Sequence, residues 1–196
     1  MLSVKVQQAY DLIDQVNEED PNIELVDGQS HPKEWLYGLR MTQCLDQFMP
    51  DADDALKIAA RAQHIKRWSV PRADYPLGRQ GYNNWRKGLG VLHGEEAMKI
   101  AARVGCNEQE IASIGKMLRK EKLKRDPQVQ ALEDVICLVF LTFYFTDFAA
   151  KHSEEKIIRI VKKTWAKMSE KGHEAALQLP FTAKQQALLS QALTPG

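Results

Sequence analysis

The stretch Leu132-Glu-Asp-Val-Ile-Cys-Leu-Val-Phe-Leu-Thr-Phe-Tyr-Phe-Thr-Asp147 places two adjacent carboxylates directly before an apolar run. Residues 135–145 contain one clearly polar side chain, Thr142. On a helix, Asp134 shares a face with Leu138, four residues further on. Because a buried charge needs a partner, we expect a core helix in which a metal ion, a histidine or an arginine satisfies Asp134.

The composition is that of a globular protein with a substantial core. The chain has 196 residues, of which 44% are hydrophobic and 27% charged, and its formal net charge is +1. Such a balance gives no overall field that would attract nucleic acid or a membrane, so any anion site must be local. Three widely spaced cysteines lie in apolar helical patterns, and we expect them to be reduced core thiols: Cys44, Cys106 and Cys137.

Two observations bear on cellular location. The N-terminal residues lack the charged-then-apolar layout of a signal peptide. The apolar run 135–145 is shorter than the roughly 20 residues that a membrane-spanning helix needs. We therefore expect a cytoplasmic protein without a membrane partner.

Hydrophobic periodicity along the chain is that of helices, with almost no strand signal. The pattern predicts an all-α protein, a single helical bundle of about 7–8 helices. The segments 18–30 and 69–81, rich in proline and glycine, are predicted to be loops. The expected helices cover 3–17, 32–48, 55–67, 82–104 (broken near its glycines), 107–124, the apolar segment from 127, 153–171 (stopped by Gly172) and a short segment after Thr182.

The sequence also predicts how the chain is organised. We expect one helical domain over residues 1–196, because no repeat or low-complexity tract interrupts it. Residues 1–30 would form an N-terminal helix and loop, residues 31–150 the core, and residues 151–196 a C-terminal helical extension.

Two histidines are candidate metal ligands, and each has a simpler alternative. His64, in Arg61-Ala-Gln-His-Ile-Lys-Arg-Trp68, can bind a metal through a neutral imidazole nitrogen. It can equally be a histidine near a helix C-terminus, where the helix dipole favours the cation. His93, followed by two glutamates after Gly94, presents the same choice between a ligand and a packing residue.

The segment 68–87 interleaves aromatic and basic side chains. Guanidinium groups bind phosphate or carboxylate in pairs of hydrogen bonds, and aromatic faces stack on bases or on guanidinium groups. The alternative is a loop that its aromatics fix to the bundle, with arginines capping helix carbonyls. The basic stretch 116–125 is more typical of a solvated helix face than of a nucleic-acid patch. The candidate ligand-binding residues are Arg40, Arg67, Arg72, Tyr75, Arg79, Tyr82, Trp85 and Arg86.

A combination of motifs resembles an uncharacterised family, domain of unknown function 4202, found in bacteria and fungi. The motifs are residues 61–68, Tyr75-Pro-Leu-Gly-Arg-Gln-Gly-Tyr82, Trp85-Arg86, His93 and Leu132-Glu-Asp-Val135. Some members of that family carry the name glutamyl-tRNA synthetase. The sequence shows no nucleotide-binding sheet or adenylate-forming motif, so we do not expect that activity.

The order of these motifs also resembles the HD superfamily of metal-dependent phosphohydrolases, which implies an HD-like helical bundle. In that family a His, a His-Asp pair and a distant Asp hold a metal. Here Tyr37 falls where the first His would lie, Gln63-His64 where the His-Asp pair would lie, and Asp134 matches the last aspartate. Tyr37 and Gln63 depart from the pattern and are poor ligands for a divalent metal. The resemblance leaves His64, His93 and Asp134 as the metal ligands.

Two functions follow as hypotheses, and the sequence leaves the enzyme status open. In the first, a divalent ion (Mn, Ni, Fe, Co or Mg) on the three ligands activates water, Glu133 or Glu96 is the base, and the substrate is a phosphorylated small molecule or nucleotide. In the second, the site is degenerate, Asp134 pairs with His64 or Arg40, and the protein is a non-catalytic module that binds a small anion, a nucleotide or RNA. A third interpretation makes the polar residues a structural network.

Overall fold

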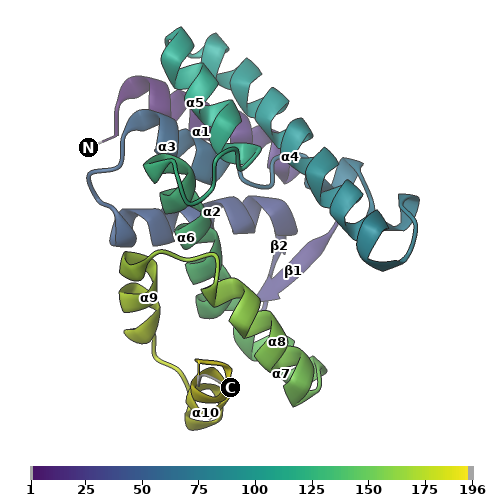
Figure 1. Ribbon diagram of the computed structural model, residues 1–196. Helices are drawn as coiled ribbons and strands as arrows, with labels where there is room; N and C mark the ends of the chain where they lie inside the picture. Colours follow the sequence, from purple (N-terminus) through teal and green to yellow (C-terminus); the bar gives the residue numbers. More distant parts are fainter. Residues whose placement is uncertain (1, 194–196) are drawn as a thin grey trace. The chain divides into compact units, whose positions relative to one another are not determined.

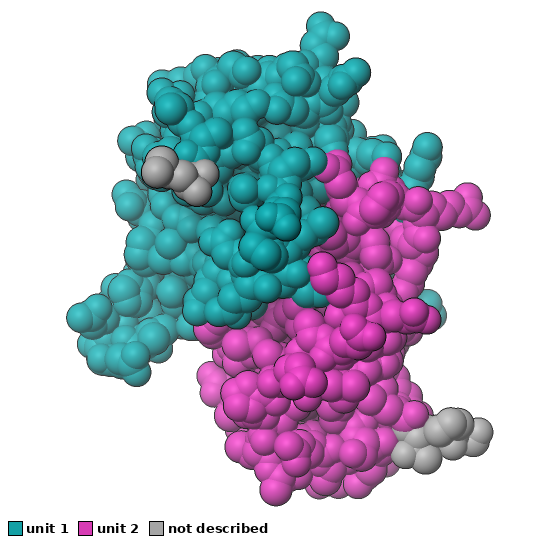
Figure 2. Space-filling view, turned by 90° about the vertical axis from the view of Figure 1, so that its left-hand side faces the viewer, with its two compact units in different colours: residues 1–122 teal, residues 123–196 magenta. Residues whose placement is uncertain are grey.

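A computed structural model describes residues 2–193 (Figure 1). These residues form ten α-helices and one two-stranded sheet. The predicted all-α class is confirmed, with a helix count somewhat above the expected 7–8. The chain divides into two compact units, residues 1–122 and residues 123–196 (Figure 2). The single domain and the segment boundaries expected after residues 30 and 150 stay predictions.

The first unit contains five α-helices around an apolar core. Helix α5 packs on α3 and α4, and α1 packs on α2 and α3. Fully buried side chains from four of these helices fill the core, among them Ile13, Met41, Ile58 and Ile114. The elements are α1 (Val4–Glu18), α2 (Lys33–Phe48), α3 (Asp54–Arg61), α4 (Gly78–Arg103), α5 (Glu108–Leu118) and the short 3-10 turns η1 (Arg67–Ser69) and η2 (Arg72–Asp74).

A β-hairpin precedes α2, where the sequence predicted only a loop. Strand β1 (Ile23–Val26) pairs antiparallel with β2 (Gln29–Pro32). Asp27 and Gly28 connect them with φ angles of 50° and 78°, the left-handed conformation of a two-residue hairpin turn. The loop prediction over 18–30 is therefore wrong. The missed signal is Asp-Gly directly after the alternating segment Ile-Glu-Leu-Val.

Several predicted helix ends are confirmed. Asn107 and Glu110 form the expected capping box at the start of α5. Gly105, with φ at 82°, follows the last residues of α4 as expected for a C-cap. Asp126 accepts hydrogen bonds at the start of the next helix, and Pro127 occupies its first turn.

Helix α4 runs unbroken through the glycines where a break was predicted. A Cβ at Gly90 would lie 3.2 Å from the carbonyl oxygen of Leu118, and a Cβ at Gly94 would lie 3.4 Å from Arg119. These glycines therefore let α5 and the residues after it approach α4 closely. The cost of glycine in a helix is offset by packing, which local sequence does not reveal.

The second unit contains the apolar stretch that opened the sequence. Helix α8 packs on α10, and α6 packs on α9. The predicted helix end at Gly172 is wrong, because α8 stops at Trp165 and Ser169 caps a new helix that includes Gly172. The elements are α6 (Pro127–Val139), the π-helical segment η3 (Phe140–Tyr144), α7 (Phe145–Lys151), α8 (Glu154–Trp165), α9 (Glu170–Leu177) and α10 (Ala183–Leu193).

The continuous helical stretch Pro127–Lys151 is the one segment among residues 2–193 long and apolar enough to cross a membrane. Its most apolar window has a mean hydropathy of 1.6, and 61% of that window is buried inside the protein. A core helix of a soluble protein has the same properties. The cytoplasmic location stays a prediction.

Candidate functional site

The segment that carries His64 is held in place by side chains of neighbouring elements. Helix α3 ends at Arg61, six residues earlier than predicted, and irregular turns follow. Lys66 has φ at 57°, and its N–H donates to the side chain of Asn17 at 3.1 Å. Ile65 beside it is fully buried. The hydrogen bond to Asn17 and the burial of Ile65 hold this segment in place. The left-handed conformation of Lys66 then turns the chain so that Arg67 begins the short helix η1.

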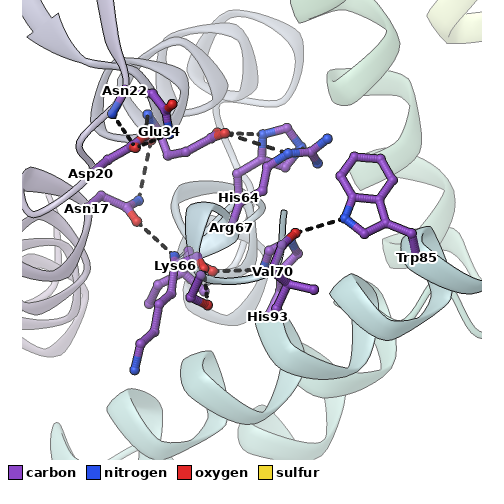
Figure 3. Close-up of polar contacts among 12 residues, drawn as sticks. Asn17, Asp20, Asn22, Glu34, His64, Lys66, Arg67, Val70, Trp85 and His93 are labelled. Carbon is purple, nitrogen blue, oxygen red and sulfur yellow. Dashed lines mark hydrogen bonds and ion pairs between the residues drawn. The ribbon is translucent and has the colours of Figure 1, made fainter. Parts of the chain in front are cut away.

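Glu34, His64 and Arg67 form a connected group (Figure 3). The Nδ1 atom of His64 lies 2.9 Å from a carboxylate oxygen of Glu34. A guanidinium nitrogen of Arg67 lies 3.1 Å from Nε2 of the same imidazole, and its Nε lies 3.6 Å from the other carboxylate oxygen. The side chain of Glu34 is 8% exposed, so it is a buried carboxylate with partners on both oxygens.

These contacts fix the protonation of the imidazole. Arginine can only donate, so Nε2 of His64 accepts and Nδ1 carries the proton that is donated to Glu34. Burial lowers the pKa of His64 well below its usual value, and the nearby cations, Arg67 first, lower it further. Burial also raises the pKa of Glu34, which Arg67 partly opposes. His64 is therefore neutral at physiological pH.

Aromatic rings support both ends of this group. The ring of Tyr37 stacks on the imidazole of His64 with centroids 3.8 Å apart and planes 13° apart. The guanidinium of Arg67 lies over the indole of Trp85 at 4.7 Å. The indole N–H of Trp85 in turn donates to the carbonyl of Val70 at 2.9 Å, as Figure 3 shows. Tyr37, which departs from the HD pattern, thus holds His64 by stacking.

His93 on α4 lies beside this group, with its ring centroid 6.0 Å from that of His64. Its Nδ1 donates to the carbonyl of Ile65 at 2.8 Å, so Nε2 carries a lone pair. Burial lowers the pKa of His93 to about 3. The residue is 3% exposed, and no group in residues 2–193 lies within hydrogen-bond reach of Nε2.

Both histidines line a pocket of about 400 Å³ in the first unit. Five cationic side chains line it together with one acid, Glu121, which bonds the guanidinium of Arg119 at 2.6 Å. Leu89, Val91 and Leu118 contribute apolar surface, and Gln63 contributes an amide. The five cationic residues are Arg67, Arg86, Lys87, Arg119 and Lys120. We call this the cationic pocket.

Close packing of α4 and α5 brings Arg119 to the pocket. A Cβ at Gly115 would lie 2.8 Å from the guanidinium of Arg119 and would also clash with the sulfur of Met98. Gly94 on the facing helix leaves room for the same arginine side chain. The glycines that weaken the helix pattern in the sequence therefore make space for a pocket cation.

The predicted ligand-binding residues separate into two groups. Arg67 and Arg86 line the cationic pocket. Arg40 pairs with Glu24 of the hairpin at 2.5 Å, and Arg72 donates to the carbonyls of residues 75 and 76. These last two arginines match the structural alternative, in which arginines bind backbone carbonyls or neighbouring acids. The predicted residues outside the pocket lining are Arg40, Arg72, Tyr75, Arg79, Tyr82 and Trp85.

The acidic candidates also have partners. Glu96 pairs with Lys99 at 2.6 Å and with Lys66 at 3.8 Å. Glu133, in the second unit, lies 3.5 Å from the amine of Lys167. Neither carboxylate lines the cationic pocket, so the structure offers no support for a role as its base.

Asp134 is buried, as the sequence predicted, and its partners lie in its own unit. One carboxylate oxygen accepts from the Ser169 N–H at 2.7 Å and from the Gln130 amide at 3.0 Å. The other accepts from the Ser169 hydroxyl at 2.6 Å. Gly172 makes this possible, because a Cβ there would lie 2.7 Å from Asp134. Asp134 thus organises the start of α9.

Two of the three predicted metal ligands, His64 and Asp134, already form hydrogen bonds with other groups. Nδ1 of His64 bears the proton donated to Glu34, and Nε2 accepts from Arg67, so neither nitrogen offers a lone pair to a metal. Both oxygens of Asp134 accept hydrogen bonds from residues of the second unit, and the set of His64, His93 and Asp134 as metal ligands stays a prediction. Across residues 2–193, no group of three or more His, Cys, Asp or Glu side chains is arranged to hold a metal.

Sequence reasoning missed part of this site. Glu34 carries the signal that drew attention to Asp134, because it shares a helix face with Tyr37 and Met41, three and seven residues further on. Arg119 and Lys120 were interpreted as a solvated face, but both line the cationic pocket. Their position depends on how α5 packs against α4, which periodicity cannot show.

Comparison with known proteins identifies a family that the chain matches. The sequence model of a family described as "Domain of unknown function (DUF4202)" matches residues 7–189. No curated protein and no solved structure matches the chain. The resemblance to the HD superfamily therefore stays a prediction.

Proposed function

The chain belongs to the DUF4202 family, and we propose that it binds a small phosphorylated or similarly anionic ligand in the cationic pocket. One observation carries the proposal. Five cationic side chains and one acid line a single pocket, and when Glu34 beside Arg67 is counted as well the excess is three positive charges, in a chain whose formal net charge is only +1. Such a concentration of like charge is unfavourable unless an anion offsets it.

The chemistry of the donors favours a phosphate group. Arg67, Arg86 and Arg119 each provide planar guanidinium groups, which bind phosphate or carboxylate through paired hydrogen bonds. Lys87 and Lys120 add ammonium groups to the lining of the pocket. A pocket of about 400 Å³ lies within the usual range for small-molecule sites.

The Glu34–His64 pair supports Arg67 in this role. Glu34 attracts the guanidinium, the imidazole of His64 accepts from it, and the indole of Trp85 lies beneath it. An arginine held on three sides loses little conformational freedom when a ligand binds. The Glu34–His64 pair would thus hold the guanidinium of Arg67 in position to bind a phosphate. Because both nitrogens of His64 already take part in hydrogen bonds, holding Arg67 is the role that we assign to His64.

A titration of purified protein with inorganic phosphate and ribose 5-phosphate tests the proposal. We expect both to raise the melting temperature, and the Arg86→Gln variant to weaken binding about tenfold, since a hydrogen-bonded charge pair contributes about 1.4 kcal/mol or more. Arg79→Gln is the matched control, because Arg79 is also exposed on α4 but does not line the pocket. Equal losses in the two variants, or no binding by the parent protein, would refute the proposal.

Metal-dependent phosphohydrolysis, expected from the HD resemblance, remains a prediction with its own test. Metal analysis of the purified protein, with and without added manganese, nickel or iron, should detect a bound ion if His64 and His93 are ligands. Loss of stoichiometric metal in a His64→Ala variant would favour that activity over simple binding. Metal-free protein that still binds ribose 5-phosphate would favour the binding function proposed here.

A further inference from the structure

The wall of the cationic pocket contains two hydrogen-bond acceptor atoms for which a bound phosphate group provides no donor. Nε2 of His93 carries a lone pair, because the ring proton is on Nδ1, which donates to the Ile65 carbonyl. Among residues 2–193, no group forms a hydrogen bond with this Nε2 atom. The amide oxygen of Gln63 is likewise buried and without a hydrogen-bond donor from residues 2–193. The two residues are 3% and 6% exposed, and both line the pocket.

Unpartnered acceptors in a protein interior are costly, typically about 1–3 kcal/mol each. The dianion of an organic phosphate has only acceptor oxygens, so its phosphate group cannot satisfy either atom. The group that satisfies them must donate hydrogen bonds. The cationic side chains therefore match one part of a ligand, and His93 and Gln63 match another.

The donor must also be uncharged. An ammonium group would donate well, but the five cations that line the pocket would repel it. A ring amino group or a carboxamide donates without carrying charge. His93 itself stays neutral for the same reason, since burial and its cationic surroundings disfavour the imidazolium form.

We propose that the ligand of the cationic pocket is an organic phosphate whose non-phosphate part presents a neutral N–H donor to Nε2 of His93. The inference rests on the proposed function and adds the second half of the ligand. Apolar side chains of Leu89, Val91 and Leu118 provide surface for the part that carries the donor. Both acceptor atoms are buried in the wall of the pocket, so the proposal includes a shift of a wall side chain when the ligand binds.

Matched ligands that differ by one amino group test the inference by calorimetric titration. AMP is compared with purine riboside 5′-monophosphate, and CMP with zebularine 5′-monophosphate, with ribose 5-phosphate as the common reference. We expect at least one amino-bearing ligand to bind about tenfold more tightly than its partner lacking the amino group. If neither amino group improves binding, the inference is overturned.

Two substitutions of His93 assign the effect to the proposed atom. His93→Asn retains an N–H for the Ile65 carbonyl but has no group at the position of Nε2, whereas His93→Gln retains an acceptor there. The amino preference, measured as the ratio of the two affinities within each variant, should fall to about onefold in the Asn variant and persist in the Gln variant. Equal preference in both variants would also overturn the inference.

The outcome separates this inference from the function on which it rests. If all the phosphates bind with equal affinity and depend on Arg86, the proposed function stands and the inference fails. If no phosphate binds at all, both fail.

Discussion

The neutral state of His93 makes a quantitative prediction about acid stability. Its pKa is about 3 in the folded protein because the ring is buried, against an unperturbed value of 6.5. Folding thus favours the neutral form. The contribution of neutral His93 to the free energy of unfolding is fully present above pH 6.5 and is lost as the pH falls from 6.5 towards 3.

The size of the loss follows from proton uptake by the unfolded chain. At pH 7 an unperturbed histidine is about one-quarter protonated, and at pH 5 it is almost fully protonated, while His93 in the folded protein remains neutral at both. Integrating the difference gives a loss of about 2 kcal/mol from this residue between pH 7 and pH 5. His64, whose pKa is also lowered, contributes in the same direction.

Urea unfolding followed by circular dichroism at pH 7, 6 and 5 measures this loss. The non-titrating variants His93→Asn and His93→Gln should each lose about 2 kcal/mol less stability over that interval than the parent protein. The comparison uses the pH dependence and not the absolute stability, so a general destabilisation by either substitution does not affect it. If parent and variants show the same pH dependence, His93 is not held in the neutral form and the account of its surroundings is wrong.

Two further predictions concern contacts that the sequence did not reveal. Asp134→Ala removes the acceptor of two Ser169 donors and should lower the free energy of unfolding by about 2–4 kcal/mol in urea titrations. Ser169→Ala should lower it by about 1 kcal/mol. Equal losses in the two variants would contradict the assigned hydrogen bonds. Gly115→Ala should displace the guanidinium of Arg119 and weaken ribose 5-phosphate binding about threefold. Gly172→Ala, which crowds Asp134 in the second unit, should leave that affinity unchanged. The reverse pattern would contradict the placement of Arg119.

Local capping signals in the sequence predicted the starts of α5 and α6 correctly, whereas the predicted C-terminal ends of α3 and α8 were wrong. Asn107 with Glu110, and Asp126 by its own side chain, act through hydrogen bonds to residues two or three positions away, and Pro127 fits the first turn because no N–H is needed there, so the sequence alone contains the whole interaction. The hairpin at Asp27-Gly28 carries an equally local signal that was overlooked. The helix α4 shows the limit of such rules, because its glycines are explained by contact with α5.

The candidate site was predictable only in part. The sequence pointed to His64, His93, Arg67 and Arg86, all of which lie at the cationic pocket. It also predicted that Asp134 would be buried, but the partner proved to be Ser169, thirty-five residues away. Such long-range pairings depend on how helices pack, and residue types alone allow a metal, a histidine or a serine equally.

The most direct test of an anion site in the cationic pocket is a titration with inorganic phosphate followed by the ¹⁵N resonances of the histidine side chains. His64 and His93 line the pocket, whereas His173 bonds the Trp165 carbonyl in the other unit. We expect saturable shifts of the His64 and His93 resonances, with the His173 resonances unchanged. Resonances of both pocket histidines that stay fixed while phosphate binds elsewhere, or fails to bind, would contradict it.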